Sequence, residues 1–189
     1  MTTEDIFRRI IEALERAGIP YMLTGSFACS YHGIPRATQD IDLVIAPTPS
    51  QLRTLVHLLP DTEYCISEDA ALDALGREGQ FNVIDLATGW KVDLIIRKSR
   101  AFSRTEFERR SAVDLFGLQL FIASAEDVLL SKLEWAKAGQ SMRQLEDCAD
   151  VLRARWEELD RDYLQQWVSQ LGLAEQFQNA QKLAGVRSG

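Results

Sequence analysis

The stretch from Thr24 to Ile45 constrains the possible folds of this chain more than any other part of the sequence. It contains a small-residue turn at Gly25-Ser26, a short helical piece, and an apolar strand that carries Asp40 and Asp42. Because side chains alternate across a strand, residues at positions i and i+2 point to the same face. Two like charges held side by side are unfavourable unless a cation lies between them. The pattern therefore predicts a metal ion bound at this strand.

A third aspartate strengthens this prediction. Asp93 lies in the apolar run Val92–Ile96, where a charge needs a partner. If that run forms a strand beside residues 41–45, Asp40, Asp42 and Asp93 gather on one face. Clustered carboxylates select hard divalent cations such as Mg²⁺ (or Mn²⁺), and substrate phosphates complete the coordination. The alternative is one surface aspartate and one tolerated aspartate, since a bare Asp-x-Asp is common.

The residues around the first aspartates are candidates for binding phosphate. Gly25 and Ser26 stand between a predicted strand and a predicted helix, where they offer backbone N–H groups and a hydroxyl. An ordinary tight turn is the alternative for this pair. Arg36 and Thr38, in the Pro-Arg corner that precedes Asp40, are further candidates for nucleotide binding.

Lys132 is a further candidate for the site. Its helical neighbours are all apolar, namely Val128, Leu129, Trp135 and Ala136. A lysine in such a stripe either reaches out from the edge of the core or points into a cleft. In the following helix, Asp147 comes four residues after Arg143, so the two side chains share a face. An exposed ion pair between them is the simplest interpretation.

Hydrophobic periodicity predicts a mixed α/β region followed by an all-helical last third. We expect helices at residues 3–17, 27–32, 51–58, 69–76 and 103–110, and strands at 21–24, 41–45 and 64–66. Two hairpins are expected, 81–86 with 91–96 and 112–115 with 118–122. A simple register across the first turn places Ile84 opposite Asp93 and directs Asp85 to the other face. The helical third begins at Ser124 and is interrupted at Gly139.

Composition limits the classes of function. The net charge of −7 argues against a general nucleic-acid coat. The segment Lys91–Arg110 differs, with seven basic and three acidic residues and a net charge of +4. A solvated surface helix or a phosphate-binding edge explains it equally well. With no apolar run of about 20 residues and no signal-peptide pattern at the start, we expect a cytoplasmic protein that does not enter the membrane.

The histidines and cysteines favour no other chemistry. His32 and His57 belong to no metal-ligand spacing, and no Gly-x-Ser-x-Gly sequence is present, so catalysis by a triad is not expected. The three cysteines, Cys29, Cys65 and Cys148, have no zinc-ligand spacing, and we expect reduced thiols.

Taken together, Gly25-Ser26, Asp40-Ile41-Asp42 and Asp93 resemble the motifs of nucleotidyltransferases of the DNA polymerase β type. Within that superfamily, the flanking HGIPRATQDIDLVI, Lys132 in EDVLLSKLEWAKAG, and Arg143 with Asp147 in RQLEDCADVL are similar to the bacterial AbiEii-like toxin group. The resemblance implies an α+β fold of the polymerase-β type, with a small mixed β-sheet flanked by helices and a C-terminal helical region. We expect a nucleotidyltransferase-like domain at residues 1–122 and a helical region at 123–189.

The same resemblance implies transfer of a nucleoside monophosphate from a nucleoside triphosphate (NTP) to an unknown acceptor, with release of pyrophosphate. Asp40, Asp42 and Asp93 would hold Mg²⁺ or Mn²⁺, and Lys132 would neutralise phosphate charge, with Asp147 orienting it. The acceptor could be RNA, a protein or a small molecule. Two alternatives remain open, a catalytically inactive nucleotide-binding or toxin–antitoxin module with an antitoxin partner, and a two-metal phosphohydrolase.

Overall fold

The computed structural model describes residues 3–35, 38, 40–115 and 117–186, and it divides the chain into two compact units. The sheet unit comprises Met1–Thr24 and Thr38–Ile122, and the helical unit comprises Gly25–Ala37 and Ala123–Gly189. The helical unit therefore takes a short segment from the N-terminal part of the chain as well as the last third. Whether residues 1–122 and 123–189 behave as separate domains stays a prediction.

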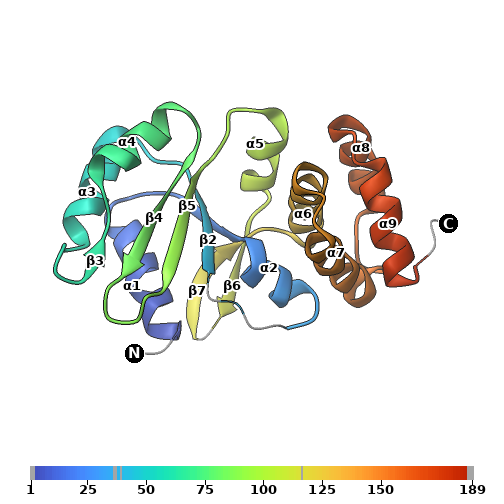
Figure 1. Cartoon of the computed structure of the whole chain (residues 1–189), viewed down its shortest axis with the longest axis horizontal. Helices are drawn as coiled ribbons and strands as arrows, with labels where there is room; N and C mark the ends of the chain where they lie inside the picture. The colour runs from blue at the N-terminus through green and yellow to red at the C-terminus, as the bar shows by residue number, and fades with distance from the viewer. Residues whose placement is uncertain (1–2, 36–37, 39, 116, 187–189) are drawn as a thin grey trace. The chain divides into compact units, whose positions relative to one another are not determined.

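The sheet unit combines helices with the strands of the sheet (Figure 1). Its helices are α1 (Thr3–Arg16), α3 (Pro49–Leu58), α4 (Glu68–Gly76) and α5 (Ala101–Glu108). Its strands are β1 (Tyr21–Thr24), β2 (Asp40–Ile45), β3 (Tyr64–Cys65), β4 (Gln80–Asp85), β5 (Lys91–Ile96), β6 (Ser111–Leu115) and β7 (Leu118–Ile122). They form one mixed sheet in the order β3-β4-β5-β2-β1-β7-β6. This mixed α/β architecture confirms the predicted fold class.

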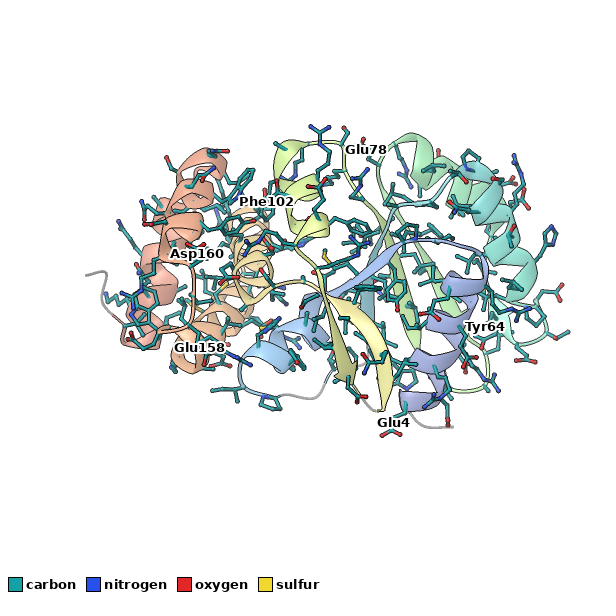
Figure 2. All side chains as sticks on the ribbon, turned by 180° about the vertical axis from the view of Figure 1, so that it is seen from behind. Glu4, Tyr64, Glu78, Phe102, Glu158 and Asp160 are labelled. Carbon is teal, nitrogen blue, oxygen red and sulfur yellow. The ribbon has the colours of Figure 1, made fainter. Side chains whose placement is uncertain are left out.

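One face of the sheet is the hydrophobic core of this unit. Ile41, Leu43 and Ile45 of β2 are fully buried and alternate with Asp40, Asp42 and Val44 on the opposite face. Helix α1, whose apolar stripe is buried, lies on one side of the strands, behind them in Figure 1 and in front in Figure 2. At the edge of the sheet formed by β3, Arg9 of α1 donates to the hydroxyl of Tyr64 at 3.4 Å. The carboxylates are thus directed away from the core.

The β4–β5 hairpin has a different register from the predicted one. Ile84 pairs with Lys91 and Asn82 with Asp93, whereas the sequence suggested Ile84 opposite Asp93. The turn is longer than expected because Asp85 accepts hydrogen bonds from the backbone N–H and the hydroxyl of Thr88 at 2.8 and 2.7 Å. The difference is two residues, which leaves every side chain on its predicted face. Asp85 does point to the face opposite Asp93.

The basic segment after β5 packs through arginine–aromatic contacts. The guanidinium groups of Arg97 and Arg110 lie 5.7 and 4.2 Å from the centre of the Phe107 ring in α5. Burial and the positive charge of Arg97 lower the pKa of Arg110. These two arginines therefore help to fix α5 on the sheet. The interpretation of Lys91–Arg110 as a solvated surface helix therefore does not hold for these two arginines.

The helical unit contains α2 (Gly25–His32), α6 (Ala125–Gly139), α7 (Met142–Arg155), α8 (Arg161–Leu171) and α9 (Ala174–Ala184). Helix α7 packs against α2, α6 and α9. Lysine and arginine side chains satisfy the carbonyl groups at two helix ends, because Lys137 donates to Gly172 and Arg153 donates to Leu183 at 2.9 and 2.6 Å. Helix α6 ends at Gly139, where the interruption was predicted, and Gln140 follows in a left-handed conformation with φ of 47°.

None of the three cysteines forms a disulfide in the described part of the chain. Cys29 and Cys148 are buried in the helical unit, and Cys65 is exposed on β3. Burial raises the pKa of the Cys148 thiol well above its usual value. Separately, none of the described helices combines the length and apolar character that crossing a membrane requires.

Gly33 marks a close approach between α2 and α7. A Cβ atom at Gly33 would lie 3.0 Å from the backbone nitrogen of Val151 and 3.1 Å from the carbonyl oxygen of Cys29. Backbone atoms cannot move aside as a flexible side chain can. Glycine is therefore the residue that lets the end of α2 contact α7.

We predict that Gly33→Ala destabilises the protein by about 1–3 kcal/mol, because the added methyl group forces backbone to shift. Urea unfolding followed by circular dichroism measures the change. Gly139→Ala is the matched control, since a Cβ atom added there would have no described atom within 4 Å, and it should be neutral or stabilising by up to about 1 kcal/mol. Equal stability of the two variants would contradict the prediction.

Candidate functional site

Four polar residues form a row across the face of the sheet opposite Ile41, Leu43 and Ile45. Thr24 on β1 pairs with Asp42 on β2, Asp42 pairs with Asp93 on β5, and Asp93 pairs with Asn82 on β4. Paired residues on neighbouring strands point to the same face and lie about 5 Å apart. The strand containing Asp93 thus lies beside β2, as the sequence analysis required, and two carboxylates stand next to each other.

Asp40 lies on the same face, two residues before Asp42, and its register partner on β5 is Lys91. The exposed fraction of the side chain falls from 59% at Asp40 to 12% at Asp93. The cluster therefore extends from solvent at Asp40 to a nearly buried carboxylate at Asp93. Such a gradient leaves Asp40 accessible to a ligand while Asp93 is held by its surroundings.

Lys91 is the residue of this cluster that the sequence analysis missed. Its ammonium nitrogen lies 2.9 Å from Oδ2 of Asp93 and 3.9 Å from Oδ1 of Asp40. The hydrogen bond to Asp93 is the main cause that raises the pKa of Lys91. The signal was present in the sequence, because Lys91 stands two residues before Asp93 in the same strand and so shares its face. In sequence it also opens the basic segment Lys91–Arg110.

The carboxylates match a divalent cation in chemical type. Three aspartates on adjacent positions of one face supply the oxygen ligands that Mg²⁺ and Mn²⁺ prefer, and the Lys91 ammonium already places positive charge among them. Yet within the described residues no three acidic, histidine or cysteine side chains are arranged as a formed metal site. The cluster thus fits a cation by its donors, and binding one requires side-chain rearrangement.

Gly25 and Ser26 follow Thr24 directly in the chain. Helix α2 starts at Gly25, two residues earlier than predicted, so that no loop separates it from β1. Gly25 has a φ of 63°, a left-handed conformation in which a side chain would be strained. The turn therefore requires glycine at this position. Thr38 lies close to Asp40, with its hydroxyl 3.5 Å from the Asp40 backbone nitrogen, whereas Arg36 is outside the described residues.

Lys132 and Asp147 form a buried pair inside the helical unit. The ammonium nitrogen of Lys132 lies 2.8 Å from Oδ2 of Asp147, and their side chains are 7% and 4% exposed. The expected exposed pair between Arg143 and Asp147 is wrong, because Asp147 is buried and Arg143 is exposed. Around this pair, Cys29 donates to the backbone oxygen of Asp147 at 3.4 Å. The geometry gives Lys132 a structural partner and explains its place in an apolar stripe.

Solved structures of nucleotidyltransferases share this fold. An antigenic nucleotidyltransferase-like protein from Paracoccidioides brasiliensis matches with a TM-score of 0.54 and 16% identity, over 96% of this chain and 93% of that chain. The lincomycin-bound lincosamide antibiotic adenylyltransferase LnuA gives 0.52 and 14%, over 80% and 96%. ANT(2″)-Ia in complex with adenylyl-2″-tobramycin gives 0.51 and 11%, over 98% of both chains.

At these identities the similarity establishes the fold alone. No protein-family model matches the chain, and no curated protein matches it either. The function must therefore be argued from the residues of this chain.

We predict that Lys132→Met destabilises the protein by about 3 kcal/mol or more, because it removes the ammonium from a buried carboxylate. The double variant Lys132→Met/Asp147→Leu should regain most of that loss, since a buried ion pair replaced by apolar side chains is often neutral. Chemical unfolding of the three proteins measures both effects. A double variant less stable than Lys132→Met would show that the pair is not the main interaction of these side chains.

Proposed function

We propose that this protein is a metal-dependent nucleotidyltransferase that transfers a nucleoside monophosphate from an NTP to an acceptor and releases pyrophosphate. The observation that carries the proposal is the direct register pairing of Asp42 with Asp93, with Asp40 on the same face. An arrangement of three carboxylates on paired strands is costly for a fold and has no structural benefit of its own. Metal-dependent phosphoryl transfer would explain why the carboxylates are arranged in this way, and the fold shared with nucleotidyltransferases supports that function.

Asp40, Asp42 and Asp93 would hold Mg²⁺ or Mn²⁺ at the sheet face. A divalent cation at this place supplies charge stabilisation for the phosphate oxygens and orients the NTP. Asp93, the most buried of the three, would also accept the proton of the acceptor hydroxyl. Asp40, at the exposed end, would make the contact that changes most as substrate enters.

The remaining residues have roles in binding. Gly25 and Ser26, directly after β1, would take the triphosphate through backbone N–H groups and the Ser26 hydroxyl. Thr38 and Arg36, just before β2, would contact the nucleotide. Lys132 would neutralise phosphate charge, a role for which its ammonium must share its contact with Asp147. The unfolding measurements on Lys132 and Asp147 test the structural role of the same pair.

The acceptor is proposed as a group with a hydroxyl. Structures of the same fold have been solved with adenylyl-2″-tobramycin and with lincomycin. For this chain, RNA, a protein and a small molecule are all candidate acceptors. An assay that does not assume the acceptor is therefore required.

A second function is favoured by one specific observation. Lys91 lies at 2.9 Å from Asp93 and reduces the negative charge of the cluster without a metal ion. This is the arrangement expected of a catalytically inactive nucleotide-binding module, such as a regulatory half of an AbiEii-like toxin–antitoxin pair with an antitoxin partner. Such a module would bind an NTP and transfer nothing.

Incorporation of label from α-³²P-labelled NTPs separates these functions. We predict that the wild-type protein labels a component of total cellular RNA, protein or small molecules with at least one of the four NTPs. Asp42→Asn and Asp93→Asn should lower the rate about 100-fold or more, because each removes a carboxylate that acts on charge in the transition state. Asp42→Asn, which removes the carboxylate next to Asp93 and keeps the Lys91–Asp93 contact, should leave the melting temperature unchanged or higher.

Asp73→Asn is the matched control, since Asp73 is an exposed aspartate on α4 that pairs with Arg77 at 3.0 Å. It should retain full activity. If the Asp40→Asn/Asp42→Asn double variant kept wild-type activity, the proposed metal ligands would be wrong. Saturable NTP binding without any labelled product would favour the inactive module.

A further inference from the structure

We propose that Lys91 is a built-in counter-ion, which holds the aspartate face together before a divalent cation binds and is displaced when the cation arrives. The inference rests on the proposed function, because it assumes that a divalent cation binds at these aspartates. It assigns to Lys91 a positioning role that acts through Asp93 and Asp40. The side chain itself takes no part in the chemistry.

The register of β2 and β5 creates the need for such a counter-ion. Asp42 and Asp93 are direct partners in the parallel pair, and Asp40 and Lys91 are the partners one step along the same face. Without a positive charge, three carboxylates would repel one another on a short stretch of two adjacent strands. Lys91 is the register partner of one aspartate and stands two residues before another. The sequence thus places one cation at the position where it reaches both.

The distances show that Lys91 interacts directly with the carboxylates. Its ammonium nitrogen lies 2.9 Å from Oδ2 of Asp93, a normal distance for a charge-assisted hydrogen bond. The 3.9 Å to Oδ1 of Asp40 is an electrostatic contact without that hydrogen bond. Lys91 is therefore attached mainly to the most buried carboxylate, which is the one that most needs a compensating charge.

The same geometry makes Lys91 an obstacle to a metal ion. A divalent cation needs carboxylate oxygens at about 2.0–2.1 Å, and an ammonium hydrogen-bonded to Asp93 uses an oxygen of that ligand. Two cations on one carboxylate pair also repel each other. Lys91 and a divalent cation would thus compete for the same carboxylate.

Displacement is feasible because the Lys91 side chain is 40% exposed. A flexible four-carbon stem can carry its ammonium out to water without a change in the backbone. The apparent affinity for the cation is then the intrinsic affinity reduced by the fraction of molecules in which Lys91 has left Asp93. Weak binding of free Mg²⁺ follows, and a cation that arrives with a triphosphate has the additional contacts to overcome it.

The test measures cation binding in the whole 189-residue chain without nucleotide. Wild type, Lys91→Met and Lys91→Arg are treated with EDTA, and melting temperatures are then recorded against Mg²⁺ concentration. Free Mn²⁺, followed by its electron paramagnetic resonance signal, gives a second measure of affinity. Lys98→Met is the matched control, because Lys98 is an exposed lysine of the same basic segment, outside the aspartate cluster.

Without cation, we expect Lys91→Met to melt below wild type. Its midpoint for Mg²⁺ and Mn²⁺ should fall about fivefold or more, since the competing charge is gone. Lys91→Arg should fold well and raise the midpoint, because a guanidinium can hold a carboxylate with two hydrogen bonds. Lys98→Met should match wild type in both measurements.

The outcomes separate this inference from the proposed function. If Mg²⁺ stabilises wild type and Lys91→Met binds it equally or more weakly, Lys91 is not a competitor, and the metal site stands without this inference. If Lys91→Met does not fold, an unchanged midpoint in Lys91→Arg overturns the inference in the same way. If neither cation binds wild type or any variant, with or without an NTP, both the inference and the metal-dependent function are wrong.

Discussion

The parallel pairing of β2 with β5 is the constraint on which the rest of the candidate site depends. The pairing brings Asp42 and Asp93 to the same step of the sheet, an arrangement that is unfavourable until positive charge is supplied. The protein supplies it with Lys91 from the same strand as Asp93. Apolar residues on the other face of both strands are buried and hold the pairing in place. The free energy gained by burying these apolar residues therefore offsets the electrostatic repulsion between the carboxylates on the opposite face.

Sequence patterns predicted which face each side chain occupies better than which partner it contacts. Alternation along a strand is a local property, so the common face of Asp40 and Asp42 could be read directly. The hairpin register was wrong by two residues, because the Asp85–Thr88 contacts that extend the turn follow from three-dimensional geometry. Arg143, the partner that helical spacing suggested for Asp147, was also wrong, whereas the family resemblance had paired Asp147 with Lys132, which comes from a different helix. Helical spacing can suggest partners only within one helix.

The chain path explains a further limit of sequence reasoning. Helix α2 follows β1 without a loop, yet it groups with the helices of the last third of the chain. Gly33 shows the physical reason, because its missing Cβ lets the end of α2 contact the backbone of α7. A glycine after a short helix reads equally well as an ordinary helix end. The contact it permits depends on a helix more than a hundred residues later in the chain.

The three thiols differ in burial, and their rates of chemical modification should differ accordingly. Cys65 is exposed on the sheet unit, whereas Cys29 and Cys148 are buried beside the Lys132–Asp147 pair, and burial suppresses ionisation of Cys148. A thiol reagent reacts with the thiolate and needs access to it. Cys65 should therefore be modified at the rate of a surface thiol. Modification of the other two should wait for the helical unit to open, so that its rate reports local unfolding of that unit without any assay of activity.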